Sequence, residues 1–305
     1  MRMLSVGSSG DDVKRLQDLL KLRHDGVFGQ VTRNAVMQYQ LAHGMTVDGV
    51  AGNEVWTMLQ LKGMTTEHIE LDTDLQNQYF KTNFGQMIQK HYLPKGQFLK
   101  GPTKNDYAFL HHTAGSDDPY SVIDAWGRDD RGEIATEFVI GGQNCSTGKK
   151  LYDGVMVQAF PKGAQAWHLG TTGSGYMNRH SVGLEICSMG YLDSELKTYV
   201  GFTAEDSQVC ELKEPFKSRL KWHNYSDAQI EGVRDWLKFI AERDNIDIRV
   251  GLVQWIKEDG PTKAFDFNID ANLGNVKGLL THTNVRKDKT DCYPHPGLVD
   301  MLMSL

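Results

Sequence analysis

Two parts of this sequence carry side chains that could bind a metal ion. The pair His111-His112 ends an apolar run, and His282 and Cys292 flank a polar segment late in the chain. Imidazole nitrogens and thiolates suit zinc, and a catalytic zinc keeps three protein ligands and one open position for water. Neighbouring residues on a strand point to opposite faces, so we expect only one of His111 and His112 at such a site.

The elements that would position these residues have an α/β pattern. Short apolar and β-branched runs over residues 107–112, 136–140, 155–160 and 181–187 predict strands. A helix is predicted from Ser226, which has capping-box spacing to Gln229. The buried stripe of this helix is expected to contain Ile230, Val233, Leu237 and Ile240. We therefore expect a catalytic domain over 101–305 with a mixed central β-sheet flanked by helices.

The first part of the chain has a different pattern. Apolar residues at helical spacing predict helices over 11–20, 32–42 and 53–61, and hence a small three-helix domain over 1–63. An Asp-Gly turn precedes the second helix at 25–26 and the third at 48–49. Residues 64–100 are predicted to be a linker that contains some helix over 75–92.

Composition narrows the classes of function. The 305 residues are 40% hydrophobic and 24% charged, with a formal net charge of -6. This balance argues against a nucleic-acid partner, because phosphate binding needs a basic surface. The sequence lacks an apolar run that could span a bilayer or act as a signal peptide, so we expect a cytoplasmic protein without membrane insertion. In that compartment the four cysteines should be thiols or metal ligands.

The N-terminal region resembles the small peptidoglycan-binding domain of many cell-wall hydrolases. The resemblance covers nearly all of 1–63, including Val13-Lys14-Arg15-Leu16-Gln17, Asp25-Gly26-Val27-Phe28-Gly29, Asp48-Gly49 and Val55-Trp56. It implies a three-helix module that docks the enzyme on the wall.

The rest of the chain carries a second set of motifs in a fixed order. They are Phe109-Leu110-His111-His112-Thr113, Thr136-Glu137-Phe138, Ala166-Trp167-His168-Leu169-Gly170, Asn178 with Gly183-Leu184-Glu185-Ile186, and His282 with Lys289-Thr290-Asp291-Cys292. This order resembles the zinc amidase family that includes phage amidase-lysozymes, wall-recycling amidases and peptidoglycan recognition proteins. The resemblance implies hydrolysis of the amide bond between N-acetylmuramic acid and L-alanine, with Zn²⁺ as the cofactor.

The family resemblance also implies a ligand set for the zinc. It maps the ligands to His111, His282 and a Cys or Asp that follows shortly after. The Lys-x-Asp spacing favours Asp291, whereas the Asp-Cys-x-Pro context and the affinity of thiolates for zinc favour Cys292. We expect Cys292 and keep Asp291 as the alternative.

Further roles follow from the same resemblance. Glu185 matches the glutamate that acts as general base, and Lys289 is the cation expected to stabilise the oxyanion. A tyrosine common in relatives is replaced by Thr136, which makes Glu137 a second acid/base candidate. The substrate cleft is expected to contain Trp167, His168 and Asn178.

The sequence as a whole favours a bacteriolytic peptidoglycan hydrolase of the phage endolysin type, which we expect to be a monomer with peptidoglycan as its partner. The absence of a signal peptide fits an enzyme made in the host cytoplasm that reaches the wall at lysis. The alternatives are a recognition protein that binds peptidoglycan without cutting it, and a cytosolic wall-recycling amidase. No role is assigned to residues 189–222.

Overall fold

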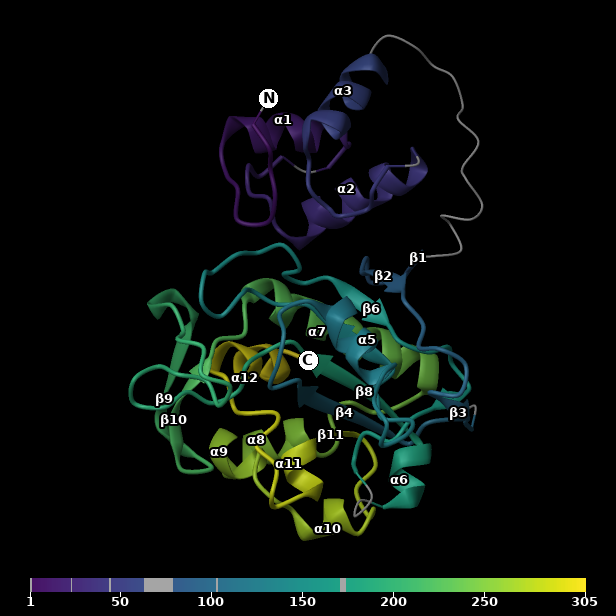
Figure 1. Cartoon of the computed structure of the whole chain (residues 1–305), viewed down its shortest axis with the longest axis vertical. Coiled ribbons are helices and arrows are strands. Elements are labelled where there is room, and N and C mark those ends of the chain that lie inside the picture. Colours follow the sequence, from purple (N-terminus) through teal and green to yellow (C-terminus); the bar gives the residue numbers. More distant parts are fainter. Residues whose placement is uncertain (1, 23, 44, 63–78, 103, 171–173) are drawn as a thin grey trace. The chain divides into compact units, whose positions relative to one another are not determined.

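The computed structural model describes residues 2–22, 24–43, 45–62, 79–102, 104–170 and 174–305. The chain divides into two compact units, Met1–Gln89 and Lys90–Leu305. Figure 1 labels most of the helices and strands of both units.

The described part of the first unit is mainly helical. It contains α1 (Asp11–Leu19), α2 (Gln30–Ala42) and α3 (Asn53–Lys62). α1 begins after Gly10, has acidic residues in its first turn, where they favour the helix dipole, and buries Val13 and Leu16. These side chains join a core that also contains Leu4, Phe28, Val36, Val55 and Trp56. The predicted three-helix domain is confirmed.

Two glutamines hold the repeated Asp-Gly turns of this unit in the same way. Each side-chain amide donates to the aspartate carboxylate of its turn, and each amide oxygen accepts from the backbone N–H of the following glycine. Both glycines have positive φ, which explains why glycine is needed there. The two sets are Gln17 with Asp25 and Gly26, and Gln40 with Asp48 and Gly49.

The segment after α3 differs from the prediction where the structure describes it. Instead of a helix, β1 (Tyr79–Lys81) and β2 (Met87–Lys90) form an antiparallel hairpin. The turn contains Gly85 at positive φ and Thr82, whose hydroxyl accepts from the Gln86 N–H. This turn interrupts the apolar spacing that predicted a helix, and residues 75–78 lie outside the described residues.

A mixed sheet forms the centre of the second unit, with strand order β6-β5-β8-β4-β11. Its strands are β4 (Tyr107–His112), β5 (Phe138–Ile140), β6 (Met156–Gln158), β8 (Ser181–Ile186) and β11 (Leu279–Thr281). β5, β8, β4 and β11 are parallel neighbours, and β6 pairs antiparallel with β5. The four strands predicted from the sequence are all present.

Helices cover both faces of this sheet. α5 (Pro119–Trp126) packs against the face that carries Val139. α7 (Asp227–Asp244) packs against the other face, where Trp236 meets Phe138. The capping box of Ser226 and Gln229 begins α7, and its predicted stripe is buried, as the sequence indicated.

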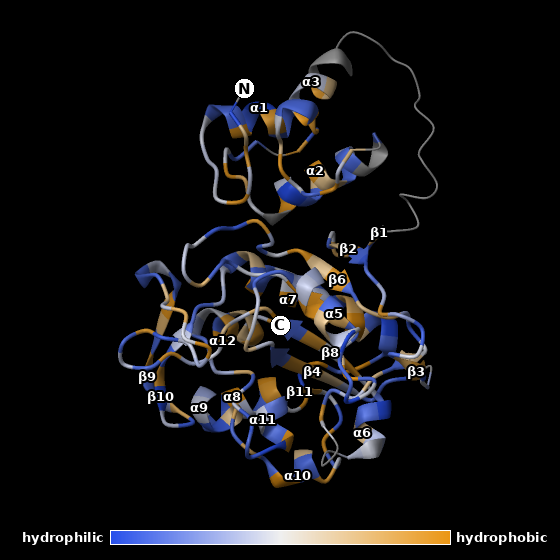
Figure 2. Ribbon diagram, in the orientation of Figure 1, coloured by the Kyte–Doolittle hydropathy of each residue, from blue (hydrophilic) through white to orange (hydrophobic). Residues whose placement is uncertain are grey.

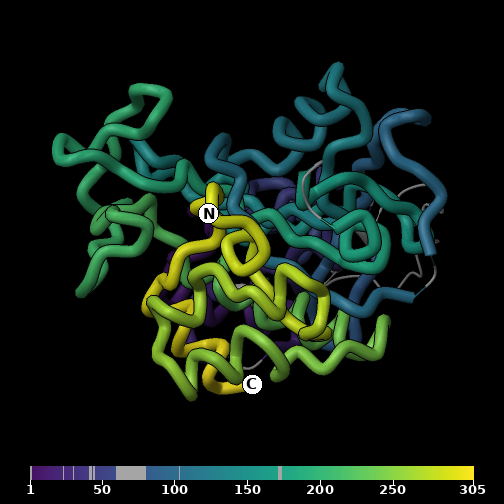
Figure 3. The backbone as a smooth tube through the Cα atoms, turned by 90° about the horizontal axis from the view of Figure 1, so that it is seen from below, coloured from purple at the N-terminus to yellow at the C-terminus, as the bar shows by residue number. Residues whose placement is uncertain are grey.

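The segment 189–222, which was left unassigned, contains a hairpin of β9 (Val209–Phe216) and β10 (Arg219–His223). Figure 3 shows this part of the chain projecting from one side of the second unit. Trp222 stacks on Tyr293 at a ring-centroid distance of 4.6 Å, which fixes the base of the hairpin. Shorter elements complete the unit: β3 (Leu99–Lys100), β7 (Ala164–Gln165), α6 (Gly175–Arg179), η1 (Asp206–Gln208), α8 (Leu252–Asp259), α9 (Pro261–Ala264), α10 (Ile269–Asn272), α11 (His282–Val285) and α12 (Pro296–Met303).

Figure 2 shows apolar and hydrophilic residues alternating along the helices of both units, as expected where one face of a helix is buried. The fold is therefore a mixed sheet flanked by helices, preceded by a small helical domain, as predicted. Within the described ranges, none of the helices has the length and apolar character needed to cross a membrane.

Candidate metal centre

Three neighbouring strands bring candidate residues into one row. β8, β4 and β11 are parallel, so their carboxyl ends meet at one edge of the sheet. His111 of β4 is in register with Glu185 of β8, and registered neighbours point to the same face. His282 follows the last residue of β11 and begins α11. The fold thus brings together His111, Glu185 and His282.

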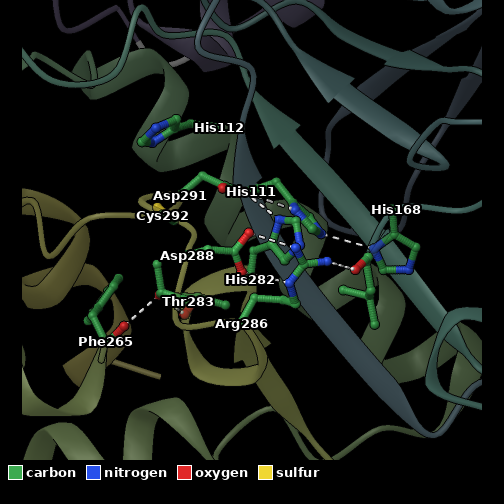
Figure 4. Close-up of polar contacts among 12 residues, drawn as sticks. His111, His112, His168, Phe265, His282, Thr283, Arg286, Asp288, Asp291 and Cys292 are labelled. Carbon is green, nitrogen blue, oxygen red and sulfur yellow. Dashed lines mark hydrogen bonds and ion pairs between the residues drawn. The ribbon is translucent and has the colours of Figure 1, made fainter. Parts of the chain in front are cut away.

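Asp291 completes a group of possible metal ligands with the two histidines. Its Oδ2 lies 3.1 Å from His111 Nδ1 and 3.0 Å from His282 Nδ1 (Figure 4). One ligand atom from each of the three residues lies within 4.8 Å of the others. Two imidazoles and a carboxylate in this arrangement are donors that zinc accepts.

Cys292, the expected third ligand, points elsewhere. Its thiol is fully buried and lies 3.1 Å from the Tyr225 hydroxyl. Burial raises the pKa of the thiol well above its usual value, so the thiolate is disfavoured there. The geometry corrects the expected set to the alternative, Asp291, because the two adjacent side chains leave the backbone in different directions (Figure 4).

The charges of the group suit a cation. Burial would raise the pKa of Asp291, but His282 and the hydrogen bonds from both histidines hold that pKa well below its usual value. Burial lowers the pKa of His111 to about 4, against the opposing effect of Asp291. The group therefore combines an ionised carboxylate with a histidine that stays neutral at pH 7.

Glu185 lies beside this group with an unusual environment. Its side chain is partly exposed, yet its Oε2 atom is buried and has no hydrogen-bond partner among the described residues. Burial and the charge of Asp291 raise the pKa of Glu185, and the nearby Lys289 opposes them. A carboxylate whose pKa is raised in this way binds protons more strongly than an exposed glutamate, which favours a role as general base.

Glu137, the second acid/base candidate, has a different role. It is 5% exposed, and Arg243 donates to both of its carboxylate oxygens at 2.5 and 2.9 Å. Gln158 donates to the same carboxylate at 2.9 Å. A buried carboxylate bound this way forms a structural ion pair, which favours a stabilising role for Glu137, and its acid/base role stays a prediction. Its neighbour Thr136 donates its hydroxyl to the Phe138 carbonyl.

The three residues predicted to line the cleft lie in different environments. Trp167 is partly exposed, and its place in the cleft stays a prediction. Asn178 is only 2% exposed, and its Oδ1 accepts from the backbone N–H groups of His168 and Leu169. Asn178 therefore holds a loop rather than lining an open cleft. His168 Nδ1 lies 2.9 Å from His111 Nε2, behind the metal group.

Sequence reasoning missed Ser181, whose Oγ lies 2.6 Å from His168 Nε2. The period of a strand could have found it. Residues 181, 183 and 185 alternate with 182 and 184, so Ser181 shares a face with Glu185. His112, by contrast, points to the opposite face and bonds Tyr225.

Two family profiles match the chain. The N-acetylmuramoyl-L-alanine amidase family matches residues 101–295, and the peptidoglycan binding domain family matches residues 9–59.

Individual relatives match smaller parts of the chain. The zinc D-Ala-D-Ala carboxypeptidase of Streptomyces albus G is 42% identical over 16% of this chain and 22% of its own length. The Burkholderia AP3 phage endolysin is 37% identical, covers 25% of this chain and 31% of its own, and has a TM-score of 0.20. The amidase LysC of Clostridium intestinale URNW is 12% identical, with 70% and 93% covered and a TM-score of 0.38.

The chain spans less than a third of the length of the carboxypeptidase and of the AP3 endolysin. The amidase profile, in contrast, spans well over half of this chain and includes every residue of the metal group. On that match, the chain belongs to the N-acetylmuramoyl-L-alanine amidase family.

Proposed function

We propose that this protein is a zinc-dependent peptidoglycan hydrolase that cleaves the amide bond between N-acetylmuramic acid and L-alanine. The observation that carries the proposal is the group of His111, His282 and Asp291 beside Glu185, whose buried Oε2 has no hydrogen-bond partner among the described residues. Family membership supports the choice of substrate.

The residues present fit a zinc ion. His111, His282 and Asp291 offer two nitrogens and one oxygen, a three-ligand set that leaves a position open for water. Two buried polar atoms nearby, His282 Nε2 and Glu185 Oε2, have no hydrogen-bond partner among the described residues. A zinc ion held there supplies Lewis-acid chemistry, which polarises a carbonyl and acidifies water.

Two side chains then handle protons and charge. Glu185, with its raised pKa, takes a proton from the attacking water and returns it to the leaving amine of alanine. Lys289 lies close enough to shift the pKa of both Glu185 and His111, and its ammonium stabilises the negative oxygen of the tetrahedral intermediate. With Asp291 as the ligand, Lys289 lies two positions before it in the sequence.

The small N-terminal domain would keep the enzyme on its insoluble substrate. Its profile match supports peptidoglycan as the partner. A wall-binding module joined to an amidase is the arrangement expected of an endolysin, which acts on intact wall rather than on small fragments.

The test is digestion of purified peptidoglycan with and without a zinc chelator. The expected products are new N-terminal alanines without new reducing sugars, lost on chelation and restored by zinc. If no new chain ends form while the protein still sediments with the wall, the protein is a recognition protein and the proposal is wrong.

A deletion of residues 1–63 tests the role of the first domain. We expect the shortened enzyme to sediment less with insoluble wall, while its turnover of soluble muropeptides changes little. Equal losses on both substrates would contradict a docking role for that domain.

A further inference from the structure

The two ring nitrogens of His111 have different partners. Nδ1 faces Asp291 Oδ2 at 3.1 Å, and Nε2 lies 2.9 Å from His168 Nδ1. The contact continues from His168 Nε2 to Ser181 Oγ at 2.6 Å, and Ser181 Oγ lies 3.4 Å from the Asn178 carbonyl. A continuous chain of hydrogen bonds therefore begins at His111 and runs away from the metal group, and Figure 4 shows its first link, between His111 and His168.

His168 is held firmly in this chain. The Asn178 side chain accepts from the backbone N–H of His168 at 3.1 Å. The His168 ring lies edge-on to the Phe109 ring, with a centroid distance of 5.5 Å. Gly183 lies against this group, and a Cβ there would clash with Thr136, at 2.8 Å from its methyl carbon, while only touching His168 Nδ1 at 3.4 Å. This packing fixes the ring with Nδ1 facing His111.

A histidine that binds a metal through Nδ1 must carry its proton on Nε2. Metal-bound histidines usually donate that second N–H to an acceptor, which fixes the ring and its tautomer. At His111 the acceptor available is the His168 ring. We propose that His168 and Ser181 are positioning residues that hold His111 with its proton on Nε2 and its Nδ1 lone pair towards the zinc, an inference that rests on the proposed zinc site.

The hydrogen bonds from His111 to Ser181 can run in either of two directions, and the number of protons is the same in both. Without a metal, His111 Nδ1–H donates to Asp291, His168 Nδ1–H donates to His111, and Ser181 donates to His168. With the metal, each ring carries its proton on Nε2, and the Ser181 hydroxyl donates to the Asn178 carbonyl. Each ring keeps one proton, so the net charge of the chain does not change.

His282 provides an internal comparison. Its Nδ1 also faces Asp291, at 3.0 Å, but its Nε2 is buried and has no hydrogen-bond partner in the part of the chain that the structure describes. Removing the His168 acceptor should therefore affect the tautomer of His111 and leave that of His282 unchanged.

The direct test is long-range ¹H–¹⁵N NMR of the imidazole rings in the full-length protein, with and without zinc. We expect zinc to move the protons of His111 and His168 together from Nδ1 to Nε2. A zinc-loaded protein with the His111 proton on Nδ1, or with His168 unchanged, would overturn the inference.

Zinc affinity, measured by competition with a chromophoric chelator, gives a second readout. His168→Phe keeps the shape of the ring but removes the acceptor, and should weaken zinc binding about 10- to 100-fold. His168→Asn returns an acceptor near the position of Nδ1 and should recover most of the affinity. Ser181→Ala should weaken binding less than His168→Phe, and Ser181→Thr, which keeps the hydroxyl, should bind like the native protein.

The melting temperature of each zinc-free variant separates positioning from misfolding. Unchanged zinc affinity in a folded His168→Phe protein would overturn the inference while the zinc site itself stands. If Asp291→Ala and His282→Ala also bind zinc like the native protein, the proposed zinc site fails, and the inference fails with it.

Discussion

Glu137 and Glu185 are glutamates of neighbouring strand regions in one sheet, and their surroundings differ. Arg243 donates hydrogen bonds to both carboxylate oxygens of Glu137, and Gln158 donates to one of them. Glu185 keeps one buried oxygen without a hydrogen-bond partner among the described residues. Both residues were acid/base candidates from the sequence, and their partners, their exposure and their distance from the metal group separate them.

The difference shows what marks a reactive site in this protein. A buried charge that lacks a partner costs several kcal/mol, so folds usually pair such groups. Gln17 and Gln40 of the first unit show the same pairing for neutral buried groups, because each uses both ends of its amide. At the metal group, Glu185 Oε2 and His282 Nε2 are two exceptions among the described residues. Buried atoms without a partner in the described part of the chain also occur away from this site, for example His223 Nε2, so the site is distinguished by the combination of Glu185 with three possible metal ligands.

The largest effect should come from Asp291, whose carboxylate lies between the two histidines of the metal group. Its neighbour Cys292, whose thiol lies against Tyr225, provides the comparison. Asp291→Asn removes the charged ligand and should abolish zinc binding and lower turnover by about a thousandfold or more, because a catalytic metal contributes several kcal/mol. Zinc content and turnover on purified peptidoglycan are the measurements.

Cys292→Ser is the matched control. Its side chain contacts Tyr225 rather than the histidines, so the variant should keep its zinc and its activity. The opposite result, with zinc lost from Cys292→Ser and kept in Asp291→Asn, would restore Cys292 as the ligand.

A second comparison exchanges the two glutamates. Glu185→Gln should keep zinc and stability but lower turnover by about 10²- to 10⁴-fold, the range typical of a lost general base. Glu137→Gln should lower the free energy of unfolding by about 3 kcal/mol, since it breaks a buried ion pair, and leave turnover of the folded fraction nearly unchanged. Turnover and urea unfolding, measured for both variants, separate the two effects.

If Glu185→Gln turns over substrate at a near-normal rate, the base lies elsewhere. A Glu137→Gln protein that is stable but inactive would show that a closed ion pair can still serve catalysis here.

Local patterns in the sequence predicted much of this fold. The strand of His111 and helix α7 were found because alternation and a capping box depend on neighbouring residues. The hairpin of β9 and β10 was not found, because it depends on distant stacking between Trp222 and Tyr293. The alternation of β9 also breaks after Leu212, where three exposed residues precede Phe216.

The site was predictable in its residue types but less so in its directions. His111, His282 and Glu185 were predicted from motifs, and the register of the sheet brings them together. Motifs could not decide between Asp291 and Cys292, since that depends on which side chain turns towards the histidines. They also could not show that Arg243 pairs with Glu137, because the two residues lie on separate elements.

The smallest predicted effect concerns His295, whose two hydrogen bonds require a neutral ring. Its Nδ1 accepts from the Leu298 N–H at the start of α12, and its Nε2 donates to Asn224 Oδ1 at 2.8 Å. Burial lowers its pKa from 6.5 to about 4, and Asp227 opposes that shift only partly. The unfolded chain therefore binds a proton before the folded one does, as the pH falls below 6.5.

The stabilising contribution of the neutral ring is complete above pH 6.5 and should be lost as the pH falls towards 4, by at most about 1.4 kcal/mol per pH unit. His295→Asn keeps a side chain suited to begin a helix but cannot titrate, so its stability should fall less between pH 7 and pH 5. Urea unfolding with a chelator present, which removes any effect of zinc, measures the difference. His112 and His223, whose pKa values are also lowered to about 4 by burial, contribute equally to both proteins and cancel in the comparison. An equal fall in both proteins would mean that His295 accepts its proton without losing its hydrogen bonds. A buried side chain with both ring nitrogens bonded would then tolerate a charge as readily as the groups around Asp291.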